Sequence, residues 1–301
     1  MFLVSSEKII RMPQVMNMSQ KNFPFLLEKL EEIYHNEHKK LIIDLREVKL
    51  LSPQAFMVIL AQLEKGEYKK NYGSILRINP RNKELLSMIN GASSNNYHHH
   101  HQCLDVKNLQ QDISVKSNST KAEIAYAIEN DLTKIRIYNF YELNTLIMEL
   151  QENALEHGIK HKDINWWLYH QYDQKRKLVK IAFVDMGCGI ITSYKESGII
   201  PKSKPEEEII IDALNGSLGS TTKEDNRGRG LPQIYTMVNN KLISDFIMIT
   251  NNVSVRYLDN KLVVQKHNNF VGTYYSFSVN ISNFNNYNIW KKGLISRKTL
   301  V

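Results

Sequence analysis

The stretch LVKIAFVDMGCGI, from Leu178 to Ile190, determines how the larger part of this chain folds. Its first eight residues are mostly apolar and predict a buried strand that ends at Asp185. Gly187 and Gly189 follow, and residues without a Cβ let the backbone turn and let a flat ligand lie close to it. A carboxylate at that turn is suited to accept a hydrogen bond from an exocyclic amine. Many ordinary turns share this composition, so the motif gains meaning only from its neighbours.

The helix expected before this strand has two polar residues on one face. In LIMELQENALEHG, Leu146 to Gly158, apolar side chains recur at helical spacing, and Glu149 and Asn153 lie four residues apart. An asparagine oxygen is a suitable ligand for a hard cation such as Mg²⁺. A carboxylate one turn away is suited to accept a proton from a water that attacks phosphorus. The alternative interpretation is a helix cap or a hydrogen-bonded buried polar pair.

A second glycine motif follows the strand, in the sequence NRGRGLPQI. Gly228 and Gly230 precede an expected helix, whose first N–H groups and positive dipole end favour a phosphate group. The alternative is again a structural turn. Three strands are expected after that helix, over residues 245–250, 261–265 and 272–280.

In chain order, these elements resemble the four nucleotide-binding motifs of the GHKL superfamily, the ATPase family of gyrase, heat-shock chaperones, histidine kinases and the mismatch-repair protein MutL. The matching residues are Glu149 and Asn153, then Asp185, Gly187 and Gly189, then Gly228, Gly230 and Leu231, and last Gly272 and Thr273. The resemblance spans residues 121–280. It implies a Bergerat-type α/β sandwich with helices on one face of a mixed sheet, and it implies ATP and Mg²⁺ as ligands.

The resemblance also implies a role for each matching residue. Glu149 falls at the general base, and Asn153 falls at the Mg²⁺ ligand. Asp185 matches the aspartate that binds the adenine amino group, and Gly189 matches the glycine that lets the base lie close. Thr273 matches a threonine that helps to bind adenine.

The same resemblance implies a mobile lid between residues 215 and 227, followed by phosphate contacts. The implied phosphate-binding residues are Gly228, Gly230 and Leu231, together with the basic residues Lys223, Arg227 and Arg229. The sequence does not select among the three cations, and each is equally compatible with a solvated loop charge.

The first 100 residues are expected to form a separate, small α/β domain. The expected elements are a strand over residues 41–45, a helix over 53–65 and a strand over 74–80. Pro53 suits a first helical turn, and Ser52 before it is suited to cap the free N–H groups of the helix.

The sequence LIIDLREVKLLSPQAFMVIL in this unit resembles the STAS domain of anti-sigma-factor antagonists. In that family a strand ending in Asp-Leu leads to a loop whose serine accepts phosphate. Pro53 stands at the phosphoacceptor position here and has no hydroxyl, and Ser52 is displaced by one residue. The resemblance therefore implies a docking role, toward the ATPase-like domain or a protein partner, rather than a phosphorylation switch.

The remaining boundaries follow from composition. Small polar residues and four histidines, His98 to His101, interrupt the α/β pattern in NGASSNNYHHHHQ. Histidine is a common metal ligand, but adjacent histidines point in different directions, so we expect a mobile loop or linker. The expected organisation is a STAS-like domain over residues 1–100, a linker over 101–120, a GHKL ATP-binding domain over 121–282 and a basic tail over 283–301.

Composition limits the function classes. The 301 residues are 42% hydrophobic and 23% charged, as in a folded soluble protein. The net charge of +8 is spread along the chain, without the basic stripe that would favour nucleic-acid binding. No apolar run approaches the ~20 residues of a membrane span, and no signal peptide opens the chain. Cys103 and Cys188 form neither a CxxC motif nor a disulfide framework. The sequence therefore predicts a cytoplasmic protein.

Two functions remain for an ATP-binding protein of this kind. The first is an ATP hydrolase or a serine/threonine protein kinase related to the anti-sigma kinases. A typical histidine kinase is not expected, since residues 121–149 contain no histidine. The second is a nucleotide-gated interaction module with little or no turnover. Glu149 favours the first, and the missing phosphoacceptor favours the second. A homodimer is left open.

Overall fold

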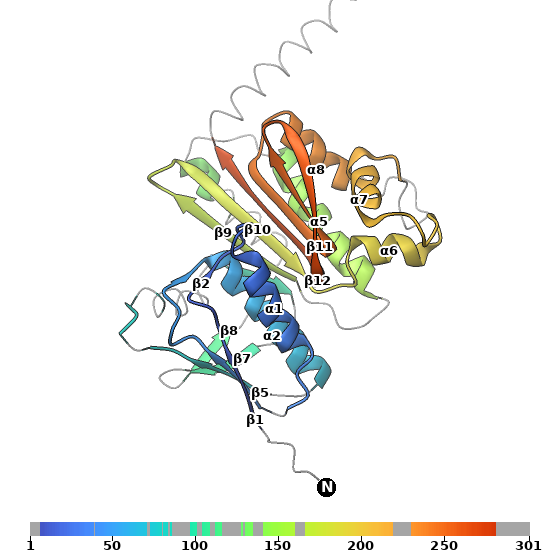
Figure 1. The fold of residues 1–301 in the computed structure, drawn as a ribbon. Helices are drawn as coiled ribbons and strands as arrows, with labels where there is room; N and C mark the ends of the chain where they lie inside the picture. The colour runs from blue at the N-terminus through green and yellow to red at the C-terminus, as the bar shows by residue number, and fades with distance from the viewer. Residues whose placement is uncertain are drawn as a thin grey trace, which may run out of the picture.

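A computed structural model describes the chain as an α/β protein with two main sheets (Figure 1). The described residues are 7–38, 40–70, 73–79, 81–83, 85, 97–100, 104–108, 112–115, 128, 130–134, 141–159, 166–218 and 230–280. Two helices from the N-terminal part lie between the sheets, and helices from later in the chain cover the far face of the second sheet. The fold class is therefore mixed α/β, as the sequence predicts.

The first sheet has five strands in the order β1-β3-β5-β7-β8. These strands are β1 (Glu7–Arg11), β3 (Lys40–Asp44), β5 (Gly73–Arg77), β7 (Leu104–Asn108) and β8 (Asp112–Val115). The first four are parallel, and β8 is antiparallel to β7. A separate parallel pair joins β2 (Val15–Met16) to β4 (Leu50–Leu51). Parallel neighbours need a crossover, and α1 (Phe23–Tyr34) and α2 (Pro53–Lys70) lie in the first two crossovers.

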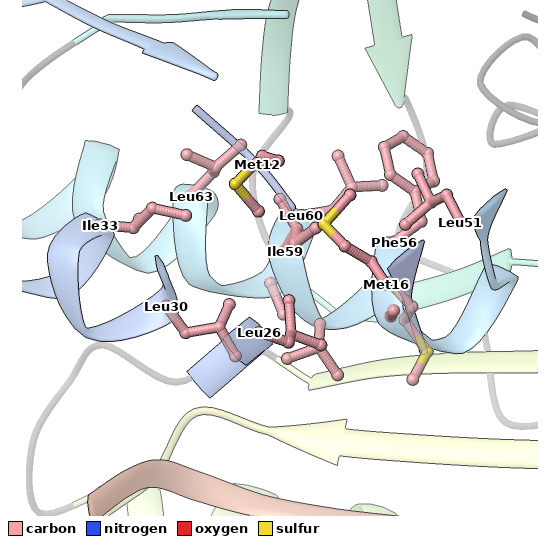
Figure 2. Close-up of a cluster of buried hydrophobic side chains, with 14 of the residues drawn as sticks. Met12, Met16, Leu26, Leu30, Ile33, Leu51, Phe56, Ile59, Leu60 and Leu63 are labelled. Atoms are coloured by element: carbon pink, nitrogen blue, oxygen red, sulfur yellow. The ribbon is translucent and has the colours of Figure 1, made fainter. Parts of the chain in front are cut away.

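Helices α1 and α2 pack together through apolar side chains at helical spacing (Figure 2). Leu26, Leu30 and Ile33 of α1 lie near Ile59 and Leu63 of α2, and each side chain is buried. Burying one aliphatic side chain stabilises the fold by about 1.5–3 kcal/mol. This contact therefore forms the centre of the first hydrophobic core.

The start of α2 has the predicted cap. The Ser52 hydroxyl accepts a hydrogen bond from the Ala55 N–H at 3.2 Å, which satisfies one free donor of the first turn. At the end of β3, the buried Asp44 carboxylate accepts hydrogen bonds from Arg46 Nε at 2.8 Å and Nη2 at 2.6 Å. This guanidinium lowers the pKa of Asp44, so the carboxylate at the strand end serves local structure.

The second sheet has the order β11-β12-β10-β9-β6. Its strands are β6 (Tyr97–His100), β9 (Trp166–Asp173), β10 (Leu178–Asp185), β11 (Ser244–Leu258) and β12 (Lys261–Asn280). Among the described strands every neighbouring pair is antiparallel, whereas the resemblance implies a mixed sheet. The helices that cover it are α5 (Tyr141–Ile159), α6 (Ile190–Ser197), α7 (Glu206–Asn215) and α8 (Gly230–Asn239).

Both faces of this second sheet are buried. Side chains alternate along its strands, so Trp167 and Val184 belong to the core around α1 and α2. Trp166 and Phe183 belong instead to the core beneath α5 to α8, where their rings stack at 5.7 Å. Burial on both faces explains why the sequence of β10 is almost continuously apolar.

The segment expected to be a loop and linker differs from that prediction. His98, His99 and His100 lie in β6, which pairs with β9 at the edge of the second sheet. The expected linker over residues 101–120 contains β7 and β8, which return to the first sheet. Four adjacent histidines gave no apolar alternation from which an edge strand could be predicted. The expected tail over residues 283–301 lies outside the described residues.

Other elements match the prediction closely or extend it. The two strands expected over residues 261–265 and 272–280 form one strand, β12, and α6 was not expected.

In the ranges that the structure describes, no helix is long and apolar enough to cross a membrane.

Candidate functional site

Asp185 and Thr273 lie side by side where β10 and β12 pair. The strand register places these two residues opposite each other. The Asp185 carboxylate accepts hydrogen bonds from the Gly187 N–H, at 2.9 Å from Oδ1, and from the Thr273 hydroxyl. The two residues that the resemblance assigns to adenine are therefore brought together, although 88 positions separate them (273 minus 185).

The charge state of Asp185 depends on its surroundings. Burial raises the pKa of Asp185 to about 6, and the Gly187 N–H, the Lys65 ammonium and the Thr273 hydroxyl partly oppose that rise. A carboxyl with this pKa is mostly ionised at pH 7.5. At that pH it is an acceptor for an amine donor, which is the chemistry that an adenine amino group requires.

Gly272 permits this close approach of the two strands. Its φ is 94°, in the left-handed region that favours glycine. A Cβ at Gly272 would overlap the carbonyl oxygen of Asp185 and lie 2.9 Å from the Cα of Met186. The backbone of β12 therefore touches the end of β10, and no other residue type fits there without a shift of the backbone.

Two residues of β11 hold the glycine turn and the start of α6. The Thr250 hydroxyl accepts a hydrogen bond from the Ile190 N–H at 2.9 Å, and Asn251 Oδ1 accepts one from the Ile191 N–H at 3.0 Å. Asn251 Nδ2 also donates to the carbonyl of Cys188 at 2.9 Å. These side chains occupy the first donors of α6, so the turn is fixed by a strand about 60 residues later in the chain.

A second cluster joins α5 to the start of α8. A Cβ at Gly230 would lie 3.1 Å from Asn153 Nδ2 and 3.6 Å from Glu149 Oε2. Glu149 and Asn153 are both half-buried, on the same face of α5. The predicted base, the predicted cation ligand and one predicted phosphate-binding glycine thus lie together. Pro232 follows in the first turn of α8, where its missing N–H costs little.

This second cluster is suited to a cation that is bound mainly by phosphate. In the part of the chain that the structure describes, no three His, Cys, Asp or Glu side chains group so as to hold a metal ion. Mg²⁺ bound with a nucleotide takes most of its ligands from phosphate and water, and one or two from the protein. Asn153 is half-buried with its Nδ2 beside Gly230, and its Oδ1 would be the single protein oxygen of that mode.

The other predicted site residues fall into two groups. Gly189 lies against Asn251 in the turn after β10, and Leu231 packs against the core beneath α5 to α8. Lys223, Arg227, Gly228 and Arg229 lie outside the described residues, as does most of the expected lid.

Sequence reasoning missed Thr250, Asn251 and Lys65. Polar residues in the run ITNN interrupt an otherwise apolar strand, and that interruption was the available signal for the first two. No local pattern distinguishes Lys65 from the other lysines of its helix, because its partner is the Met186 carbonyl at the end of β10, far away in the sequence.

The chain was also compared with known proteins. No protein-family model matches it, and no curated protein matches it. A functional assignment must therefore come from the residues and their geometry.

Proposed function

We propose that the second sheet and its helices form a GHKL-type domain that binds ATP with Mg²⁺. The main support is the pairing of Asp185 with Thr273 across β10 and β12. A half-buried carboxylate beside a buried threonine hydroxyl, at a strand end with a glycine turn, suits recognition of an aminopurine. The clustering of Glu149, Asn153 and Gly230 supports a triphosphate and cation at the second cluster.

The chemistry proposed for the second cluster is transfer of the γ-phosphoryl group to water or to a protein hydroxyl. The oxygen of the attacking water or hydroxyl forms a bond to the γ-phosphorus while Glu149 accepts its proton. The bond from the γ-phosphorus to the β,γ-bridging oxygen breaks, and ADP leaves. Mg²⁺, when bound, would supply positive charge that offsets the charge of the phosphate oxygens. Asn153 would hold the cation, and Gly230 leaves room for phosphate close to the start of α8.

A second candidate function is a nucleotide-gated interaction module with little or no turnover. The hydrogen bonding of Ser52 favours this alternative. Its hydroxyl already caps α2 by accepting a hydrogen bond from the Ala55 N–H, so Ser52 has a structural role at the position near the family's phosphoacceptor. The STAS-like unit then has a docking role.

A direct experiment separates these functions. Titration calorimetry of the full chain with ATP and Mg²⁺ should give saturable one-site binding. Incubation with γ-labelled ATP, alone and with a cell lysate, then distinguishes released phosphate, labelled protein and unchanged ATP. Absence of binding to any adenine nucleotide would contradict the proposal. Binding without turnover would favour the interaction module.

A further inference from the structure

Helix α2 of the N-terminal unit reaches the end of the second sheet where Asp185 lies. Lys65 Nζ donates a hydrogen bond to the carbonyl oxygen of Met186, the residue after Asp185. Its neighbour Glu64 accepts a hydrogen bond from Trp167 Nε1 at 2.7 Å. Lys65 is 8% exposed and Glu64 is 6% exposed, so both contacts are buried.

Two buried charged side chains in a row are unusual at the contact between two units. A buried charge destabilises the fold unless hydrogen bonds and opposite charges compensate it. Part of the compensation for Lys65 comes from the second sheet, through the Met186 carbonyl and the charge of Asp185. Apolar packing of Val184 and Met186 in the same core as α2 excludes water from these contacts.

The contact acts on the backbone that presents Asp185. Met186 lies between Asp185 and the turn at Gly187, and its Cα faces Gly272 on the other strand. The Met186 carbonyl and the Gly187 N–H belong to one peptide group, and that N–H donates to Asp185 Oδ1. A hydrogen bond from Lys65 to the Met186 carbonyl therefore fixes the peptide whose N–H orients the Asp185 carboxylate. The ammonium also favours the ionised form of that carboxylate.

We propose that Lys65 is a positioning residue for adenine recognition, so that nucleotide affinity depends on the docking of the N-terminal unit against the second sheet. This inference rests on the proposed function. It places a regulatory residue outside the nucleotide-binding unit, on α2 of the N-terminal unit. Any partner that pulls α2 away from the sheet would weaken nucleotide binding. Nucleotide binding would, by reciprocity, strengthen the docking of α2.

Among the residues that the structure describes, the charged and titratable groups around Asp185 come from α2, α6, β12 and the glycine turn. Lys65 and Glu64 lie on α2, Cys188 lies in the glycine turn, Glu196 of α6 acts on Cys188, and Tyr275 lies on β12. Among these groups Lys65 is the cation that holds the pKa of Asp185 down. Its removal should therefore raise the pH at which nucleotide affinity is half lost, an effect that a purely structural lysine would not have.

The test compares Lys65→Met with Lys8→Met in the full chain. Lys8 Nζ also donates to a backbone carbonyl, that of Glu32 at 3.4 Å, but within the N-terminal unit. We expect Lys65→Met to weaken ATP affinity about tenfold by calorimetry, the size of a lost charged hydrogen bond. It should also move the pH midpoint of binding upward. Lys8→Met should leave both quantities unchanged, and Lys65→Arg, which keeps the charge, should restore most of the affinity.

The outcomes are distinct. Wild-type affinity together with a wild-type pH midpoint in Lys65→Met would overturn the inference. If Lys65→Met does not fold, as judged by circular dichroism, the same two measurements on Lys65→Gln decide the question. A wild-type chain that binds no adenine nucleotide contradicts the proposed function instead. Amide exchange over residues 185–191 then tests the positioning role, with faster exchange in the variant supporting it and equal rates overturning it.

Discussion

The two clusters of the candidate site are built in different ways. Asp185 and Thr273 are held by the register of two paired strands and by direct hydrogen bonds. Glu149 and Asn153 are held by the packing of α5 against α8, with Gly230 at the contact. Strand register allows few small adjustments, because a slip of one residue would turn every side chain to the opposite face. Packed helices shift by ångströms more easily. A rigid cluster for the adenine ring and an adjustable cluster for the phosphates would suit a nucleotide that must bind and then react.

The largest expected effect is a loss of turnover when Glu149 of the helical cluster is replaced. Glu149→Ala should bind ATP with nearly wild-type affinity and lose turnover by about 10²–10⁴-fold, the usual consequence of removing a general base. Single-turnover measurements with labelled ATP give the rate, and calorimetry gives the affinity. Glu152→Ala is the matched control, because Glu152 is an exposed carboxylate on the same helix. Equal loss of affinity and rate in Glu149→Ala would contradict the division of roles.

The next effect concerns the strand cluster and its fold. Gly272→Ala should lower the free energy of unfolding by on the order of 3 kcal/mol, because the new Cβ meets the Asp185 carbonyl at a left-handed φ. Gly198→Ala is the control. Gly198 has a φ of 73° with open space around it, so only the conformational cost of about 1 kcal/mol remains. Urea unfolding of both variants separates the two contributions, and similar destabilisation of the two would show that the contact is not tight.

Changing the charge at the strand cluster should weaken nucleotide binding. Asp185→Asn keeps an oxygen for the Gly187 N–H and turns an NH₂ group toward the adenine amine. We expect ATP affinity to fall by about 1.5–3 kcal/mol, or ten- to a hundredfold. Asp245→Asn is the control, since Asp245 is exposed on β11. Calorimetry that gives the same affinity for all three proteins would remove Asp185 from the base-binding role.

The smallest expected effect is a dependence on pH. The pKa of Asp185 is raised to about 6, so the carboxylate is charged above that pH and protonated below it. The ratio of wild-type to Asp185→Asn affinity cancels the titration of ATP itself. This ratio should be largest near pH 7.5 and fall, by about tenfold, as the pH is lowered through 6 to 5. A constant ratio across this range would contradict an ionised acceptor at this position.

The sequence predicted the parts of the fold that depend on local pattern. The bounds of β10 match because apolar residues end at a single aspartate, and α8 matches because its apolar residues recur every three or four positions. The clustering of Glu149 with Gly230 could be expected only through the resemblance, because 81 positions separate them (230 minus 149).

What could not be predicted depends on contacts between distant segments. The capping of α6 by Thr250 and Asn251 requires the pairing of β11 with β12, and strand pairing is not encoded in any short window. The strand at His98–His100 forms because β9 offers an edge, not because histidine favours a strand. The contact of Lys65 depends on how the two units dock.

Burial of the second sheet on both faces has a practical consequence for anyone who expresses part of this chain. A fragment that starts near residue 121 would lack α1, α2 and the edge strand β6. Its sheet would present Trp167, Tyr169 and Tyr274 to water, together with an open hydrogen-bonding edge on β9. Such a surface favours self-association and strand-to-strand aggregation. Truncation at the apparent domain boundary should therefore yield insoluble material, whereas cleavage of the intact chain in that segment should leave the two pieces associated.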